Sequence, residues 1–208
     1  MDNKAIMKRF STISTTAVSD ATGGHTNVSA AIKPLCDHFK IAGRAITVRL
    51  PDGENGAVLE AISKAERGDI VVIDAKGNMN RAVAGDFVMQ LAKGVGIQGF
   101  VVDGVIRDLA AVKELNFPIF ALGTTVAAGQ KHGGGEVGVP IALGDVAVHT
   151  GDVIVGDIDG VVVVPYEQLE TIIQGAEEKM EKDMAREVEA LEKGEESIRA
   201  YLNKVLAK

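Results

Sequence analysis

The sequence predicts an α/β fold in which helices and strands alternate through the middle of the chain. Three observations support this prediction. Apolar runs of strand length are bounded by turn residues, the stretches between them have helical spacing, and no apolar run approaches the length of a membrane span. Such alternation is typical of parallel βαβ units. The strands are expected at residues 45–50, 69–75, 100–102 and 118–122.

The first half of the chain opens with helices and then supplies the first two strands. Residues 4–20 have the pattern of a short helix, a loop and the start of a second helix. After a turn-rich segment and the strand at 45–50, apolar residues at helical spacing predict a helix over 55–65. The next strand, DIVVIDA, is expected to end at Gly77.

The stretch from Gly85 to Asp108, GDFVMQLAKGVGIQGFVVDGVIRD, begins as an amphipathic helix that several glycines then interrupt. A short buried strand follows, with a turn expected at Asp103-Gly104. The next helix is expected over 109–115. The central stretch is therefore a strand between two helices.

Loops that flank such a strand meet at one edge of the sheet, where α/β proteins usually bind ligands. Asp86, Arg107 and Asp108 lie in those loops and are expected to converge. Two carboxylates and a guanidinium suit a hard cation together with an anionic substrate.

The last part of the chain changes character. Residues 124–165 are rich in Gly and Val and predict short strands, with Asp159-Gly160 as the clearest hairpin turn. Residues 166–208 contain 11 acidic and 7 basic side chains and predict one long charged helix. We therefore expect one α/β unit over residues 1–165 and a helical arm over 166–208 that packs on a neighbouring subunit.

Composition excludes several classes of protein. The net charge of −7 argues against a nucleic-acid ligand, because phosphate binding needs a basic surface. Cys36 is the only cysteine, so neither an internal disulfide nor a cysteine-based zinc site is expected. The N-terminal residues lack the apolar core of a signal peptide, and we expect a cytoplasmic protein without a membrane partner.

A purely structural interpretation of the central acids competes with the functional one. Asp86 would cap the helix after Gly85, Asp108 would cap the helix that begins at Leu109, and Arg107 would neutralise one of them. Capping aspartates are common, so spacing alone favours this interpretation.

Several segments together resemble a known family, that of the regulator of ribonuclease activity A (RraA-like proteins) and the 4-hydroxy-4-methyl-2-oxoglutarate aldolases. The resemblance rests on the central stretch, on TTAVSDATGG near the start, on FPIFALGTT and on VHTGDVIVGDIDGVVVVP. It includes the charged C-terminal helix and covers most of the chain, which reverses the preference for a capping role.

The resemblance implies a swivelling β/β/α type of sandwich, assembled as a homotrimer or hexamer, with Mg²⁺ or Mn²⁺ in a site between subunits. The family's metal-contacting acid falls on Asp108, its substrate-clamping arginine on Arg107 and its other site acid on Asp86. The segment that holds the pyruvoyl carboxylate starts at Gly85 and uses the amides of Phe87 and Val88. A glutamate from a neighbouring subunit falls at or near Glu181. Ala111 stands where the family often has another acid, which leaves the metal's outer shell short of one carboxylate.

Three functions are compatible with this resemblance. The first is a divalent-metal-dependent aldolase that cleaves 4-hydroxy-2-oxo acids to pyruvate and also decarboxylates oxaloacetate, since both reactions pass through a pyruvate enolate. The second is a non-catalytic regulator that binds a ribonuclease. The third is a domain related to those fused to hexulose-phosphate synthases, for which no clear phosphate loop is found. The presence of Asp86, Arg107 and Asp108 together favours the enzyme.

Overall fold

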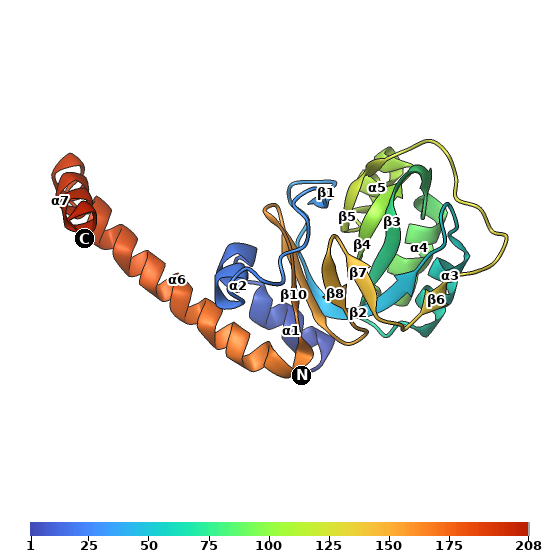
Figure 1. Cartoon of the computed structure of the whole chain (residues 1–208), viewed down its shortest axis with the longest axis horizontal. Coiled ribbons are helices and arrows are strands. Elements are labelled where there is room, and N and C mark those ends of the chain that lie inside the picture. The colour runs from blue at the N-terminus through green and yellow to red at the C-terminus, as the bar shows by residue number, and fades with distance from the viewer. Residues whose placement is uncertain (208) are drawn as a thin grey trace.

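The computed structural model describes residues 1–207, and its centre is a mixed sheet whose two ends nearly meet, with helices on the outside (Figure 1). The strands are β1 (Lys33–Pro34), β2 (Ile41–Arg49), β3 (Ile70–Ala82), β4 (Gly99–Ile106), β5 (Ile119–Thr124), β6 (Glu136–Val137), β7 (Ile141–Leu143), β8 (Val146–Val148), β9 (Val153–Asp157) and β10 (Gly160–Val164). The helices are α1 (Asn3–Phe10), α2 (Thr15–Ala21), α3 (Gly56–Lys64), α4 (Asp86–Val95), α5 (Leu109–Leu115), the 3₁₀ turn η1 (Tyr166–Gln168), α6 (Leu169–Leu191) and α7 (Glu195–Leu206).

The predicted parallel βαβ units are confirmed. Strands β2, β3, β4 and β5 are neighbours in that order and run parallel, and the helices α3, α4 and α5 make the connections between them. These helices bury their apolar faces on one side of the sheet, where Val58, Met89 and Val112 are fully covered. The carboxyl ends of the parallel strands therefore lie at one edge, as the helical spacing predicted.

The sheet nearly closes because different parts of the long strand β2 pair with different strands. Its first residues, Ile41 to Arg44, pair with the antiparallel strand β9, and the residues after them pair with β3. Strand β10 returns along β9, and at the far end of the sheet the Nζ of Lys33 in β1 donates to the main-chain oxygen of Asp159 at 2.7 Å. The enclosed space is filled by apolar side chains, including those of Ile70, Val101 and Phe120 and of the hairpin β7–β8.

The predicted hairpin at Asp159-Gly160 is present with its turn one residue earlier, and the predicted turn at Asp103-Gly104 is wrong. The β9–β10 hairpin turns at Ile158 and Asp159, and Gly160 is already paired with Asp157 as the first residue of β10. The chain also passes straight through Asp103 and Gly104 as strand β4. Gly104 permits this because a Cβ there would lie 2.9 Å from the Cβ of Ala75 on the neighbouring strand.

Strand β3 is longer than the sequence predicts. Lys76 and Gly77 adopt left-handed backbone angles with φ of 57° and 67°, which are typical of a turn. The register with β4 shifts there, and the strand resumes and runs on to Ala82. A turn signal in the sequence is thus an irregularity within a strand.

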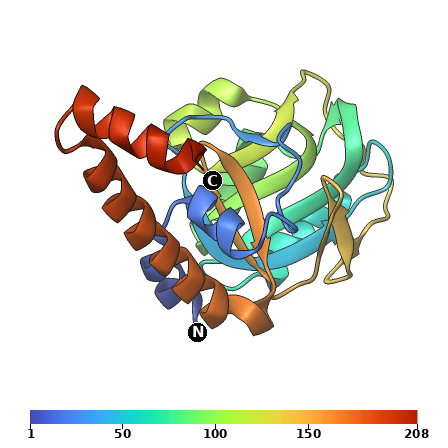
Figure 2. The ribbon, with the colours of Figure 1, turned by 60° about the vertical axis from the view of Figure 1, so that its left-hand side comes forward.

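The C-terminal region is two helices and not one. Helix α6 ends at Leu191, Gly194 is the N-cap of α7 with φ 62° and ψ −134°, and α7 doubles back from the far end of α6 (Figures 1 and 2). Lys204 of α7 contacts Glu189 of α6 at 2.7 Å. The first turns of α6 belong to the body, because Ile173 and Ala176 are fully buried against α1, α2 and the β9–β10 hairpin. The rest projects away from the sheet as an arm (Figure 1).

The α/β class and the C-terminal helices are confirmed. The swivelling β/β/α assignment and the division at residue 165 stay predictions. Within residues 1–207, no helix combines the length and the apolar character needed to cross a membrane.

Candidate functional site

The ends of β3 and β4 bring the three predicted residues into one place. The backbone N–H of Arg107 donates to the carbonyl of Ala84 at 3.1 Å, which ties the segment after β4 to the segment after β3. From there, the Oδ2 atom of Asp108 accepts the backbone N–H of Asp86 at 3.2 Å. The same oxygen lies 3.3 Å from the Nε of Arg107. The predicted convergence is therefore confirmed.

The capping interpretation is wrong in its details. Gly85 is the N-terminal cap of α4, and Asp86, the first helical residue, makes no side-chain cap. Asp108 is the N-cap residue of α5 and Arg107 pairs with it as that interpretation expects, but its side chain makes no capping hydrogen bond to α5 and instead accepts the first N–H of α4. The backbone of Asp108 is left-handed, with φ 61° and ψ 39°, a conformation that Asp and Asn tolerate better than other side chains. That conformation turns the chain from β4 into α5.

Gly85 is required because of how closely the two side chains pass over it. A Cβ at this position would lie 2.5 Å from the Oδ2 of Asp108 and 2.9 Å from the Nε of Arg107. Its φ of −134° is open to any residue, so the constraint is space and not backbone conformation. Glycine therefore leaves room for the acid and the guanidinium above the start of α4.

The start of α4 also offers main-chain donors. The N–H groups of Phe87 and Val88 have no protein acceptor within residues 1–207, as expected for the first turn of a helix. The side chain of Phe87 is 67% exposed and forms no part of the core. Two free N–H groups at a helix N-terminus beside a guanidinium are suited to a carboxylate.

A pocket of about 150 Å³ lies over these groups. One wall is Gly85 to Val88 with Arg107, and the opposite wall is Asn55, Gly129 and Lys131. The sequence analysis missed the second wall, because nothing in the spacing links residue 55 to residues 129–131.

The second wall is built by a loop fixed to the start of α3. The carbonyl of Gln130 accepts the N–H of Asn55 at 3.0 Å. Glu54, only 7% exposed, accepts the backbone N–H of His132 at 3.1 Å, and its carboxylate lies 3.2 Å from the Nδ1 of the same histidine. The Oδ1 atom of Asn55 is buried and has no partner among the described residues. It is an acceptor beside the pocket.

Glu181 is not brought to this site within one chain. It is an exposed residue of α6 in the part that projects away from the sheet, whereas Arg107 directly follows β4 within the sheet (Figure 1). Its predicted role, which needs a neighbouring subunit, stays a prediction.

The oxygen atoms at the site suit a hard cation that takes most of its ligands from water and substrate. Within residues 1–207 no group of three or more His, Cys, Asp or Glu side chains is placed to hold a metal by itself. The Asp108 side chain is 37% exposed and only its Oδ2 is occupied by protein donors. Mg²⁺ commonly binds through one or two carboxylates and completes its shell with water and substrate oxygens. The residues present therefore fit such an ion.

Comparison with known proteins finds a matching family model and a relative of high sequence identity. The family model described as RraA-like, Aldolase/RraA, matches residues 15–163. A protein of Halalkalibacterium halodurans that carries the provisional name 4-hydroxy-4-methyl-2-oxoglutarate aldolase is 52% identical over 95% of this chain and 94% of its own.

Two solved structures have the same fold. One is a Streptomyces coelicolor protein described as an unusual member of the RNase ES inhibitor RraA family, with a TM-score of 0.80 and 27% identity over 89% of this chain and 98% of that one. The other is the RNA-processing inhibitor RraA from Thermus thermophilus, with a TM-score of 0.68 and 28% identity over 73% of this chain and 92% of that one. With most of its length matched by the family model and by a relative of high identity, the chain belongs to the RraA-like aldolase family.

Proposed function

We propose that this protein is a divalent-metal-dependent carbon–carbon lyase that cleaves 4-hydroxy-2-oxo acids to release pyruvate and that also decarboxylates oxaloacetate. One observation carries the proposal: Arg107, the two acids and two unpaired N–H groups meet over the start of α4. A protein that only docks to a partner has no need of such a set. The identity to a relative with an aldolase name supports the same activity.

The substrate would be held by its pyruvoyl end. The N–H groups of Phe87 and Val88 would bind the carboxylate, and Arg107 would donate to the oxygens of the 2-oxo acid. The 4-hydroxyl end would lie toward Asn55 and Lys131 on the opposite wall. Because Gly85 has no side chain, Arg107 and Asp108 would have the space to reach the substrate.

Cleavage breaks the bond between carbons 3 and 4, and its electrons pass into the 2-oxo group to give the pyruvate enolate. Arg107 would stabilise the negative charge that develops on that oxygen. The proton lost from the 4-hydroxyl and the one gained at carbon 3 would move through water held by Asp86 and by Glu181 of a neighbouring subunit. Asp108 would hold Mg²⁺ or Mn²⁺, which supplies Lewis acidity to the 2-oxo acid when bound. This route needs no covalent intermediate on a lysine, so the proposed mechanism is of the class II type.

The arm accounts for the intersubunit part of the proposal. Met184, Val188 and Leu191 lie on α6 at helical spacing and are 64%, 62% and 59% exposed. Apolar side chains in such a row favour burial against another surface. We propose a homotrimer or hexamer in which the arm of one subunit reaches the site of the next.

A second candidate function is supported by the likeness to the Thermus RNA-processing inhibitor. In that case the chain would bind a ribonuclease, and the residues over α4 would have no catalytic role. An assay of the Arg107 variants separates the two functions, because docking does not require a guanidinium in this pocket.

The decisive experiment measures pyruvate release from a panel of 4-hydroxy-2-oxo acids and from oxaloacetate, with Mg²⁺ or Mn²⁺ and with a protein-free blank at each metal concentration. We expect release above the blank, its loss in excess chelator and its return with metal. Full activity in chelator would overturn the metal mechanism. Absence of activity on every substrate would favour the regulator.

A further inference from the structure

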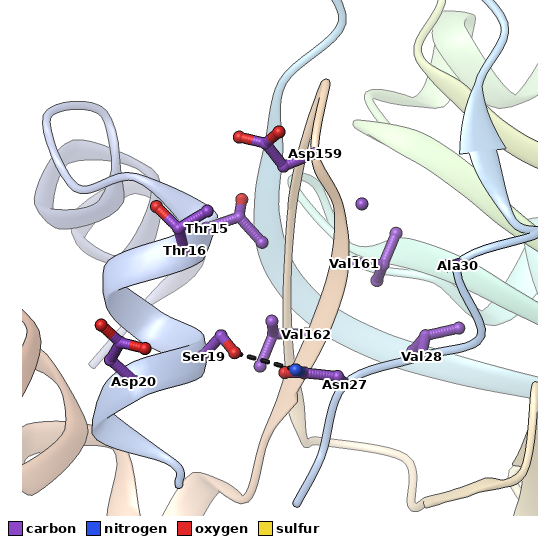
Figure 3. Close-up of a pocket in the computed structure, with 11 residues that line it drawn as sticks. Thr15, Thr16, Ser19, Asp20, Asn27, Val28, Ala30, Asp159, Val161 and Val162 are labelled. Carbon is purple, nitrogen blue, oxygen red and sulfur yellow. Dashed lines mark hydrogen bonds between the residues drawn. The ribbon is translucent and has the colours of Figure 1, made fainter. Parts of the chain in front are cut away.

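A second pocket, of about 310 Å³, lies between α2, β10 and the segment 27–30 (Figure 3). None of its lining residues belongs to the pocket over α4. Thr15, Ser19 and Asp20 come from α2, and Asp159 comes from the β9–β10 turn.

The walls of this pocket are fixed by hydrogen bonds that do not use the groups facing into it. The carboxylate of Asp157 accepts the N–H of Thr15 at 2.9 Å and the N–H of Asp159 at 3.0 Å, which joins α2 to the turn. On the other side, the N–H of Val28 donates to the carbonyl of Val161 at 3.0 Å. The Asp157 carboxylate and one main-chain hydrogen bond therefore fix the walls of the cavity.

One buried polar group in the pocket lacks a partner among the described residues, and an exposed carboxylate lines the same pocket. Thr15 is 3% exposed, and its Oγ1 has no hydrogen-bond partner among the described residues. In Figure 3 this hydroxyl points toward the end of the pocket at which Asp159 lies. The carboxylate of Asp159 forms no ion pair within residues 1–207, whereas Asp20 is paired with Lys179 at 3.2 Å. Buried hydroxyls are normally paired, so Thr15 points to a missing ligand atom.

The lining defines the chemistry of that ligand. Among the described lining residues there is no Lys or Arg, which disfavours an anion, and no aromatic ring on which a base or sugar would stack. The floor is apolar and consists of Val28, Val161 and Val162. An acid and a hydroxyl above an aliphatic floor match a positively charged head with a short hydrocarbon tail.

We propose that this pocket is a second ligand site and that it binds a short aliphatic ammonium ion. The ammonium group donates to the carboxylate of Asp159 and to the Oγ1 of Thr15, and the tail covers the valines of β10. Asn27 contributes to the rim, where its Nδ2 donates to the Oγ of Ser19 at 2.8 Å (Figure 3).

The test is a ligand-observed NMR titration of the full-length protein with butylammonium, 1-butanol and butanoate. The three probes share a tail and differ in the charge of the head. We expect saturable binding of butylammonium, about 10-fold weaker binding of 1-butanol and no binding of butanoate, since bonds between charged partners contribute most. Butanol or butanoate binding as tightly as the amine, or no saturable binding of the amine, would overturn the proposal.

Variants locate the site. Asp159→Asn keeps the shape of an exposed turn residue and should weaken butylammonium binding about 10-fold. Thr15→Val is nearly isosteric and removes only a hydroxyl without a partner, so binding should weaken about threefold with no loss in Tm. Asp37→Asn removes the same charge from an exposed position outside the pocket and should bind as the wild type does. Equal affinity of the wild type and Asp159→Asn would contradict the assignment, as would equal losses in Asp159→Asn and Asp37→Asn.

Discussion

The carboxylate of Asp108, at the end of β4, accepts the backbone N–H of Asp86 at the start of α4 across 3.2 Å. An acid that follows one strand thus caps the helix that follows the neighbouring strand. The bond holds α4 in position and leaves the next two N–H groups of the helix free. Asp108 therefore has a structural contact as well as its proposed role at the metal, and a test must separate the two.

Asp108→Asn makes that separation. Asparagine tolerates the left-handed backbone at this position, and its amide oxygen can still accept the Asp86 N–H. We expect Tm to change little and the response of pyruvate release to Mg²⁺ or Mn²⁺ to be lost, because the amide has no negative charge for the cation. Titration of activity against metal, with thermal unfolding alongside, checks this. A variant with the metal affinity of the wild type would exclude Asp108 as the ligand.

Arg107→Lys tests the guanidinium. Lysine keeps the charge but loses the paired donors, so we expect kcat/KM for oxaloacetate decarboxylation to fall on the order of 100-fold. Arg107 is 41% exposed, so the fold should survive. Arg9→Lys, at a surface ion pair with Glu177, is the matched control and should retain full activity. If Arg107→Lys were as active as the wild type, Arg107 would be no more than a partner of Asp108.

Gly85→Ala tests the crowding at the start of α4. The new Cβ must displace Asp108 or Arg107, and we expect at least a ~10-fold loss of kcat/KM, since misplacement by about 1 Å is costly. Gly94→Ala is the control, because a Cβ there meets nothing within 4 Å and α4 should gain roughly 0.5–1 kcal/mol. Equal activities of the two variants would show that the contacts over Gly85 do not position the site.

We expect subunit assembly to depend on the exposed apolar side chains of α6, Met184, Val188 and Leu191. Met184→Glu combined with Val188→Glu places charges on the exposed row of α6 and should lower both the mass in sedimentation and the activity. Lys182→Glu, also on α6 and paired with Glu178, should leave the mass unchanged. A fully active monomer at low concentration would contradict the intersubunit site.

Asp103 gives a prediction about pH. Burial, the largest cause, raises the pKa of this carboxyl above its ordinary value of 3.8, and the neighbouring Asp74 raises it further. A raised pKa means that the folded state binds the proton more tightly, so the cost of the ionised acid is present at neutral pH and fades as the pH falls through the folded pKa. Asp103→Asn should therefore unfold at a higher temperature than the wild type at pH 7, with the difference shrinking toward pH 4. A constant difference across that range would show that ionisation is not its cause.

The sequence predicted the convergence of Asp86, Arg107 and Asp108 because the rule behind it is general. Alternating strands and helices place strand ends at one edge, whatever the details of packing. The capping partner of Asp108 could not be predicted, since it depends on the rotation of α4 against β4. The wall of Asn55 and Lys131 could not be predicted either, because it depends on a loop tied down by Glu54 and His132.

The errors in secondary structure have a common physical cause. Residues 76–77 and 103–104 have turn-forming composition, yet pairing between β3 and β4 keeps both segments in the sheet. Local preference amounts to about 1 kcal/mol, and tertiary pairing overrides it. In the C-terminal region local preference prevails: within residues 1–207 no sheet pairs with the segment between Leu191 and Gly194, and the charged helix is interrupted there.

In the proposed site, Phe87 and Val88 act through their N–H groups, and the Phe87 side chain is exposed. Every amino acid except proline carries that group. Nearly any side chain can therefore be exchanged at residue 87 without deleting the donor. Under the proposed binding mode, the side chain at residue 87 can change what surrounds the ligand while the donor to the carboxylate stays, and proline is the one replacement that would remove that donor.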